Sequence, residues 1–407
     1  MPQAPLLYLF LSYPLIDFLF RTVLPIPFLS SIWDELLILL LFMFILFKRN
    51  PAPRPFPVIS KPMLAFFIVG LAYLTIDMEQ WGITIEGFRA VYQYILAFFI
   101  GYYLLSQKEE VQKYLYFMIV LAFMIGLYGI MQKFAGVQTP QSWIDASEGI
   151  TFRAFSIVQS PNVLGAYMIL MIPITLTFIF LEKSLPKKLL LLFFFLTMLG
   201  ALYLTLSRGA WIALVASFAI IGSLYNRKVL FLGLGIAILS LIFVPSVNQR
   251  VSHLFSKSYM ESSLKDGRVA RWISAYDRMR NDPFFGSGLG HYGGAVAKRN
   301  LQTIYVDSYY FKTLGEMGIV GLGIFFWLLY VLMRNIYLYL KRIKKPYQLL
   351  LIGGIFTGLL NVILHNAVEN IFEVPFMTTF FWFLGGIALS YPFLGERKNE
   401  EIIKGVS

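Results

Sequence analysis

The stretch that decides the fold is residues 262–294, SSLKDGRVARWISAYDRMRNDPFFGSGLGHYGG, a polar and basic segment in a strongly apolar chain. It belongs to a longer segment of the same character, residues 247–308, which has long apolar segments on both sides. Elsewhere the charged residues are confined to short links between apolar segments. Only residues 247–308 are long and polar enough to form a water-facing layer above a membrane, so we expect the functional face there.

The composition indicates an integral membrane protein. Of the 407 residues, 58% are hydrophobic, 17% aromatic and 14% charged, which is more apolar surface than one soluble core can bury. The net charge of +12 is explained by Lys and Arg held on the cytoplasmic side of the membrane, so no nucleic-acid partner is expected. The chain has no Cys and three His, which excludes disulfides, thiolate nucleophiles and Cys- or His-rich metal sites. We expect neither a metal nor a cofactor.

The apolar segments predict an all-α membrane fold. Segments long enough to span a bilayer give about twelve candidate transmembrane helices, near residues 3–20, 31–47, 62–77, 89–106, 114–133, 161–181, 188–206, 209–225, 229–246, 309–333, 347–364 and 374–394. We expect one polytopic domain over residues 1–407, with one large extracytoplasmic loop at 247–308 carrying short amphipathic helices, and a solvated tail at 395–407. The first apolar segment lacks a basic start and a small-residue cleavage site, so it is predicted to be a retained helix.

The distribution of Lys and Arg orients the predicted helices. The links on one face hold most of the basic residues, whereas the links on the other face hold few outside the long loop. The positive-inside rule therefore places the loop outside the cytoplasmic membrane and both termini in the cytoplasm. A second outer link, residues 135–160, is expected to form a structured lip before a helix at Pro161. Its Arg153 is a candidate for binding substrate.

Three further arginines are candidates for binding an anionic substrate, because a guanidinium is planar, always charged and suited to phosphate oxygens. Arg208 lies in the very short outer link of YLTLSRGAWIALVASF, where it either reaches lipid headgroups or points to the underside of the loop. Arg268 and Arg271 lie in DGRVARWISAYDRMRNDP, which predicts an amphipathic helix. Its apolar residues at helical spacing are Val269, Trp272, Ile273, Tyr276 and Met279. This helix either lies on the lipid surface or covers a cavity that holds an anionic lipid-linked substrate.

The end of the loop adds two more features. The glycine-rich run at 286–294, which contains His291, is a weak nucleotide fingerprint. Close backbone packing and an approach of backbone N–H groups to a phosphate both explain it. Asp307 stands just before the next predicted helix, where it either caps that helix or accepts a proton from an attacking hydroxyl.

Polar residues on the neighbouring helices complete the candidate set. Tyr309 and Glu316 belong to the helix after the loop, and a carboxylate at the depth of Glu316 must be paired or protonated. In the last outer link, His365, Glu369 and Glu373 follow each other at intervals of four, so they are predicted to share one helical face. We expect Tyr309, Glu316, His365 and Glu369 to contribute to substrate binding.

Four pieces of the sequence, in this order, resemble the O-antigen ligase and polymerase superfamily. They are RAFSIVQSPNVLGAYMILMIPI, LSRGAWIAL, GRVARWISAYDRMRNDPFFGSGLGHYGG and VDSYYFKTLGEMGIVGL, and the resemblance covers roughly residues 130–390. It implies an all-helical bacterial envelope glycosyltransferase that needs no metal. Such enzymes take a glycan from undecaprenyl pyrophosphate and join it to lipid A core, in ligases, or to another lipid-linked repeat unit, in polymerases.

The resemblance also implies roles for individual residues. Arg208 matches an essential arginine at the start of the helix after the short outer turn, and Arg268 matches the arginine of the loop's Gly-Arg motif. The ligase signature near the end of the loop is a His, then Asn, Ser or Gln, then nine residues and Gly-x-x-Gly. The residues that fit this spacing are Ser308, Gly318 and Gly321. Asp307 occupies the position of the His, which favours a repeat-unit polymerase over a ligase.

The implied reaction assigns chemistry to these residues. Cleavage of the bond between sugar and diphosphate builds negative charge on the leaving group, which Arg208, Arg268 and Arg271 are expected to stabilise. Asp307 is expected to take the proton of the acceptor hydroxyl or to orient it, with His291 or His365 in reserve. The expected partners are an undecaprenyl-pyrophosphate-linked glycan donor, a glycan or other hydroxyl acceptor, and the lipid bilayer of the bacterial cytoplasmic membrane.

Two other classes of protein stay open at this point. A lipid-linked oligosaccharide flippase would fit the number of helices, although its two halves usually show a repeat that this sequence lacks. A non-catalytic membrane scaffold would leave Arg208 and Asp307 unexplained.

Overall fold

The structure is a computed structural model that describes residues 4–24, 26–47, 54–76, 79–144, 151–225 and 227–395. Within these ranges the chain is helical and forms two isolated β-bridges but no strand. The all-α class predicted from the apolar pattern is therefore confirmed. The predicted tail at 395–407 lies outside the described residues, apart from Gly395.

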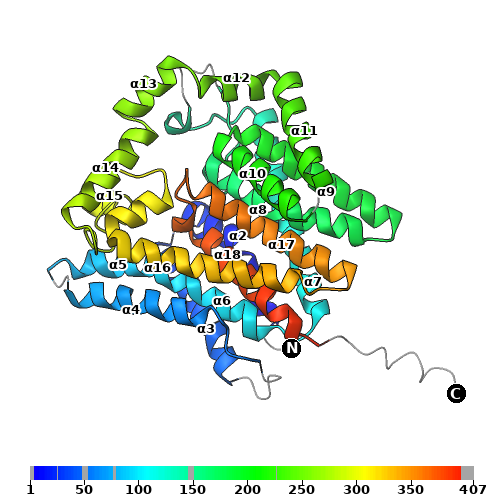
Figure 1. Cartoon of the computed structure of the whole chain (residues 1–407), viewed down its shortest axis with the longest axis horizontal. Helices are drawn as coiled ribbons and strands as arrows, with labels where there is room; N and C mark the ends of the chain where they lie inside the picture. Colours follow the sequence, from blue (N-terminus) through cyan, green and yellow to red (C-terminus); the bar gives the residue numbers. More distant parts are fainter. Residues whose placement is uncertain are drawn as a thin grey trace.

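The apolar segments predicted to span the membrane fall on helices (Figure 1). These are α1 Ala4–Leu11, α2 Tyr13–Phe18, α3 Pro27–Phe47, α4 Ser60–Ile76, α5 Trp81–Tyr92, α6 Ala97–Phe99, α7 Lys108–Phe134, α8 Pro161–Leu181, α9 Leu185–Thr205, α10 Arg208–Tyr225, α11 Arg227–Phe243, α16 Tyr309–Leu340, α17 Pro346–His365 and α18 Pro375–Ser390. Short turns of other helix types, η2 Gln93–Leu96 and η3 Ile100–Leu104, continue α5 and α6 into one longer helical segment. The loop adds α12 Pro245–His253, α13 Lys257–Lys265, α14 Arg268–Asn281 and α15 Ala295–Leu301.

Fewer helices satisfy the requirements of a membrane span than the twelve predicted. Seven described helices are long and apolar enough to cross a membrane, or eight if the bent pair Ala4–Leu11 and Tyr13–Val23 forms one span. That pair corresponds to the first predicted span, which is broken by a bend of 65°. The helices at Ser60–Thr75 and Arg208–Leu224 are apolar but shorter. A multi-pass membrane protein is supported, whereas the number of twelve spans is not confirmed.

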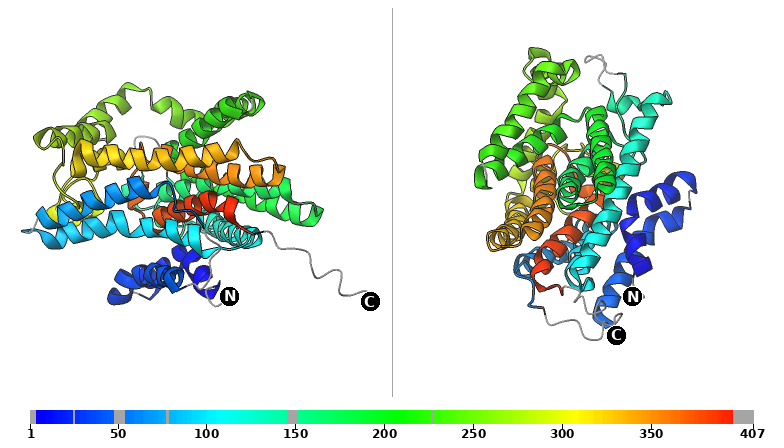
Figure 2. Two further views of the ribbon diagram at one scale, coloured as in Figure 1. Left: turned by 60° about the horizontal axis from the view of Figure 1, so that its bottom comes forward. Right: turned by 90° about the vertical axis from the view of Figure 1, so that its right-hand side faces the viewer.

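Helices α8 and α17 pack closely against each other, and this contact determines which of their ends lie side by side. On α17, a Cβ atom added to Gly354 or Gly358 would clash with α8, and Asn361 Nδ2 donates to the carbonyl of Ile169 at 2.7 Å. Small residues permit such a close approach between membrane helices. Because the two helices run antiparallel, the C-terminal end of α17 lies beside the N-terminal end of α8. The N-terminal helices α1 to α3 lie on the side of the bundle away from the loop (Figure 2).

The loop forms an arch of short helices, α12 to α14, along one side of the bundle (Figure 1). The amphipathic helix predicted in the loop is α14, and only part of its predicted apolar set is buried. Ile273 and Tyr276 are 48% and 50% exposed, whereas Ala275 and Met279 are buried. Trp272 stacks on Phe311 of α16 with 5.4 Å between ring centroids. The small side chain of Ala275 lets α14 lie directly on α16, and this contact selects the buried face.

The glycine-rich run of the loop fills a break in α16. Gly318 has φ +64° and ψ −165°, so the helix is interrupted there. After the break, the N–H groups of residues 319 and 320 donate to the carbonyls of Pro283 and Phe284 at 2.9 and 3.1 Å. Before it, the carbonyls of residues 315 and 316 accept from the N–H groups of residues 287 and 288 at 3.0 and 2.9 Å. Both broken helix ends are thus satisfied by the loop, as buried backbone groups require. Close backbone packing, rather than phosphate binding, accounts for the glycines.

Candidate active site

A polar cavity of about 240 Å³ lies between the arch and the bundle. This is slightly below the range of about 300–1,000 Å³ that is usual for small-molecule sites, so it suits the charged head of a ligand rather than a whole lipid. Its lining residues are Ser142, Trp143, Ile144, Arg153, Asn162, Arg208, Arg250, Arg268, Arg271, Asp307 and Glu369. Six of the ten residues predicted for the site line it: Arg153, Arg208, Arg268, Arg271, Asp307 and Glu369.

Four helices present their N-terminal ends to this cavity. Arg208 and Arg268 are the first residues of α10 and α14, and Asn162 is the second residue of α8. Asp307 directly precedes Ser308, the residue that caps α16. The N-terminal end of a helix carries a partial positive charge and unpaired N–H groups, which favour an anion.

The side chains add to this positive character. Among the lining residues, arginines outnumber carboxylates by five to two. A guanidinium cannot lose its proton at physiological pH and offers several donors in one plane, which suits phosphate oxygens. The cavity therefore favours a ligand with more than one negative charge.

Arg153 joins the segment before α8 to the helix ends around it. It donates to the carbonyls of Thr205 at 2.8 Å and Trp143 at 3.0 Å, and to Asn162 Oδ1 at 2.8 Å. Burial lowers the pKa of Arg153 to about 10, against the opposing effect of Glu369, so the guanidinium stays charged at neutral pH. Its guanidinium thus links the carbonyls of Thr205 and Trp143 to the side chain of Asn162.

Glu369 lies at the centre of the polar contacts. Its Oε1 accepts a hydrogen bond from Asn162 Nδ2 at 2.6 Å and forms an ion pair with Arg268. Burial raises the pKa of Glu369 to about 7, although Arg268 acts in the opposite direction. A carboxyl group with this pKa exchanges its proton near neutral pH, which is the property required of a general base.

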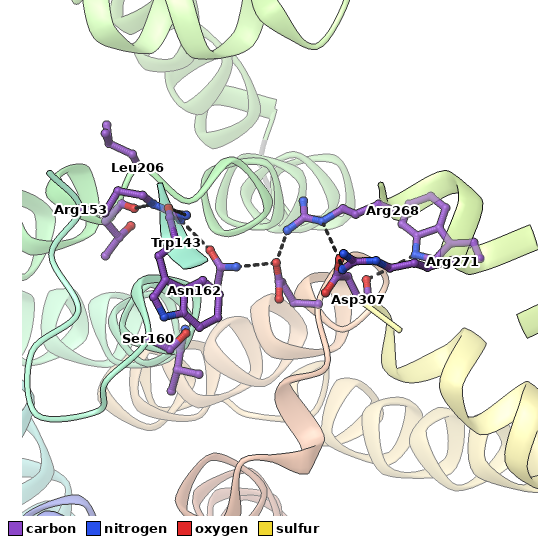
Figure 3. Close-up of polar contacts among 12 residues, drawn as sticks. Trp143, Arg153, Ser160, Asn162, Leu206, Arg268, Arg271 and Asp307 are labelled. Atoms are coloured by element: carbon purple, nitrogen blue, oxygen red, sulfur yellow. Dashed lines mark hydrogen bonds and ion pairs between the residues drawn. The ribbon is translucent and has the colours of Figure 1, made fainter. Parts of the chain in front are cut away.

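Asp307 is held by two arginines. Its Oδ2 accepts from Arg271 Nη1 at 2.6 Å and lies 3.9 Å from Arg268 Nε (Figure 3). Burial disfavours the charge of Arg268, but Glu369 and Asp307 raise its pKa above the ordinary value. Asp307 does not cap α16, which was one of its two predicted roles. The cap is Ser308, whose Oγ accepts from the N–H of Phe311 at 3.4 Å. Asp307 is therefore placed to orient the arginines of the cavity.

Arg208 and Arg250 also line the cavity. The guanidinium carbon of Arg208 lies 4.9 Å from the ring centroid of Tyr259, in a cation–π contact. Arg250 Nη2 donates at 2.7 Å to the carbonyl of Leu206, which has φ +50° in the tight turn between α9 and α10. A left-handed leucine is uncommon, and here it shapes the turn that carries Arg208.

Three lining residues, Arg250, Asn162 and Trp143, were not predicted from the sequence. Arg250 was one basic residue among many in the loop, and only its position on α12 beside the turn at Leu206 marks it. Asn162 follows Ser160 and Pro161 at a helix start, a pattern that indicates helix capping rather than a site. Asn162 lies in RAFSIVQSPNVLGAYMILMIPI, one of the four segments that resemble the family, and this position is the signal that could have identified it.

Four predicted residues lie outside the cavity lining. His291 bonds Gln80 Oε1 through Nε2 at 2.9 Å, at the side of α5. His365 is fully buried beneath Gly209, and neither ring nitrogen has a hydrogen-bond partner among the described residues. Tyr309 lies in a cation–π contact with Lys312, 5.5 Å from the ring centroid. The fourth residue is Glu316.

Glu316 belongs to a buried ion cluster that fastens the loop to α16. Lys312 Nζ lies 2.5 Å from Glu316 Oε2 and 3.5 Å from Glu373 Oε1. Glu316 also accepts from the N–H of Gly290 at 3.1 Å, and Glu373 from that of Ala295 at 2.9 Å. Of the two states predicted for Glu316, paired or protonated, the structure shows the paired one.

The shared helical face predicted for His365, Glu369 and Glu373 is wrong. Helix α17 ends at His365, so Glu369 lies in the turn that follows and Glu373 in a separate short helical turn. Glu369 faces the cavity, whereas Glu373 joins the ion cluster at Lys312. Among the described residues, no group of three or more His, Asp and Glu side chains could hold a metal ion.

Comparison with known proteins supports the resemblance seen in the sequence. No curated protein matches the chain. Residues 193–326 match the family described as O-antigen ligase, a range that includes Arg208, Arg250, Arg268, Arg271 and Asp307. Arg153, Asn162 and Glu369 lie outside the matched range, and the fold brings them to the same cavity. Residues 193–326 therefore carry the O-antigen ligase domain of the O-antigen ligase and polymerase superfamily, as the sequence predicted.

Proposed function

We propose that the protein transfers or polymerises an oligosaccharide carried by undecaprenyl pyrophosphate on the outer face of the bacterial cytoplasmic membrane, most simply as a repeat-unit polymerase. The observation that carries this proposal is the cavity in which five arginines and four helix N-terminal ends surround two carboxylates. Fixed positive charge of this density suits a diphosphate. Asp307, in place of the ligase histidine, is the feature that favours polymerisation.

The reaction that we propose exchanges one bond at the anomeric carbon of the donor sugar. The acceptor hydroxyl oxygen forms a bond to this carbon, while the bond from the carbon to the phosphate oxygen breaks. The polyprenyl diphosphate leaves with the electron pair of that bond. Arg208 and Arg268 are placed to stabilise the charge that develops on it, with Arg271 and Arg250 in support.

The acceptor hydroxyl must lose its proton during the attack, and we assign this proton to Glu369. Its buried carboxyl group has a pKa of about 7, so a substantial fraction is ionised and able to accept a proton at neutral pH. Asp307 is engaged by Arg271 at 2.6 Å and lies 3.9 Å from Arg268 Nε. In this assignment Asp307 positions Arg268 and Arg271.

A second candidate function is that of a ligase that transfers the glycan to a lipid, a wall polymer or a protein. The description of the matched family as O-antigen ligase favours it. The bond change at the donor is the same in both reactions, so the roles of the arginines and of Glu369 are unchanged. Only the acceptor differs.

Reconstitution in vesicles with an undecaprenyl-diphosphate-linked repeat unit tests the proposal. A polymerase yields a ladder of lipid-linked products of increasing length, and a ligase yields one transfer to an added hydroxyl acceptor. Arg268→Ala should abolish either product, whereas Arg342→Gln, on an exposed residue beyond the far end of α16, should not. Movement of the lipid-linked saccharide across the bilayer without a new glycosidic bond would identify a flippase and refute the proposal.

A further inference from the structure

A second polar cavity lies along the other end of α14. Its volume is about 730 Å³, which is within the range of cavities that bind small molecules. Its lining residues are Ser274, Asp277, Arg278, Arg280, Asn281 and Tyr292. All six side chains carry hydrogen-bonding groups, and none belongs to the cavity described above.

Residues on one side of α14 line both cavities. Arg271 lines the first cavity, and Ser274, Arg278 and Asn281 line the second. Successive intervals of three, four and three residues keep these side chains on one helix face. At 1.5 Å per residue, the row from Arg271 to Asn281 extends over about 15 Å. A ligand that begins in the first cavity would have to extend about this far along α14 to reach the residues that line the second.

The second cavity offers one cation that the protein itself does not bind. Arg280 Nη1 lies 3.8 Å from Asp277 Oδ1, so these two charges largely offset each other. Arg278 makes no hydrogen bond or ion pair within the described part of the chain, and neither does the side-chain amide of Asn281. Both side chains are exposed to water in the cavity, where their donors are available to a ligand.

The remaining lining suits a sugar. Ser274 Oγ and Tyr292 Oη are hydrogen-bonded at 2.8 Å, which sets two hydroxyl groups side by side at the wall. Tyr292 is otherwise buried and packs against Gly315 of α16, where a Cβ atom would lie 2.5 Å from its ring. The wall is thus rigid, with hydroxyl and amide groups that both donate and accept, as the hydroxyls of a saccharide require.

We propose that this second cavity binds an anionic saccharide, with Arg278 holding its carboxylate or other negative group. The inference rests on the proposed function, because the saccharide is taken to be the glycan whose diphosphate lies in the first cavity. Arg278 confers a preference for an acidic sugar over a neutral one, since a guanidinium pairs with a carboxylate through two parallel hydrogen bonds. The substrate class of the enzyme is then an acidic polysaccharide repeat unit.

The test titrates the full-length protein, in a neutral detergent, with tetragalacturonate as an acidic probe and maltotetraose as its neutral counterpart. We expect tetragalacturonate to bind with saturation and maltotetraose to bind about tenfold more weakly. Arg278→Gln should remove most of this difference, and Asn281→Ala should weaken both saccharides by about threefold. Arg342→Gln serves as the matched control for loss of one exposed positive charge and should change neither.

The inference is overturned if both saccharides bind equally well, or if Arg278→Gln leaves the affinity for tetragalacturonate unchanged. Inorganic pyrophosphate, titrated in the same preparation, separates this outcome from a failure of the proposed function. Binding of pyrophosphate without tetragalacturonate would leave the first cavity intact and remove only the second-cavity inference. Binding of tetragalacturonate but not of pyrophosphate would support the saccharide site and refute the proposed diphosphate site.

Discussion

Replacement of Glu369 by Gln gives the sharpest test of the proton acceptor. The amide oxygen of Gln can still accept from Asn162 and Arg268, so the geometry of the contacts is kept while the basicity is lost. A general base contributes about a hundredfold or more to a rate, and we expect Glu369→Gln to lower turnover by at least about that factor. With a pKa of about 7, wild-type Glu369 is about one-tenth ionised at pH 6 and about nine-tenths ionised at pH 8.

The assay is the initial rate of glycosidic bond formation in vesicles between pH 5.5 and 8.5. Wild-type activity should rise as the pH increases through about 7, because the active form is the deprotonated one. The residual activity of Glu369→Gln should lack this rise. Glu86→Gln is the control, since Glu86 forms an exposed ion pair with Arg299 away from both cavities. A Glu369→Gln variant with near-normal turnover and an unchanged pH profile would refute the assignment.

Three further predictions concern charge and backbone. Arg208→Ala should reduce turnover by about a hundredfold while the amount of protein in the membrane, measured by immunoblot, stays the same; full activity would remove Arg208 from the site. Asp307→Asn should raise KM for the lipid-linked donor more than it lowers kcat, because Arg271 loses its charged partner; a large loss of kcat alone would make Asp307 the base. Gly318→Ala should lower the melting temperature, because φ is +64° and a Cβ would lie 2.5 Å from the carbonyl of Phe284, a strain of about 1–3 kcal/mol; an unchanged thermal unfolding curve would contradict the break in α16.

The helices could be predicted because the bilayer imposes their length and apolar character directly on the sequence. The break at Gly318 could not, since it depends on a loop segment at 283–288 that supplies partners for both broken ends. The buried face of α14 was predicted only in part. Of the apolar residues at helical spacing, Met279 is buried and Trp272 stacks on Phe311 of α16, whereas Ile273 stays exposed; the small Ala275, which is fully buried, does not belong to that set.

Four of the five arginines that line the site could be found, because charge at a membrane boundary requires an explanation and because Arg208 and Arg268 lie in family motifs. The partner of Glu369 could not be found in this way. Asn162 and Glu369 are 207 residues apart and meet at 2.6 Å because α8 and α17 pack antiparallel. Their contact is a product of helix packing that no local pattern records.

A structure with a bound donor analogue tests the central claim most directly. The analogue is an undecaprenyl diphosphate saccharide in which a methylene group replaces the oxygen between sugar and phosphorus, so that the bond cannot be cleaved. We predict that its diphosphate oxygens lie about 3 Å from the guanidinium nitrogens of Arg208 and Arg268, inside the cavity that Glu369 also lines. A diphosphate bound elsewhere on the protein, with both guanidinium groups contacting only the protein, would contradict the account.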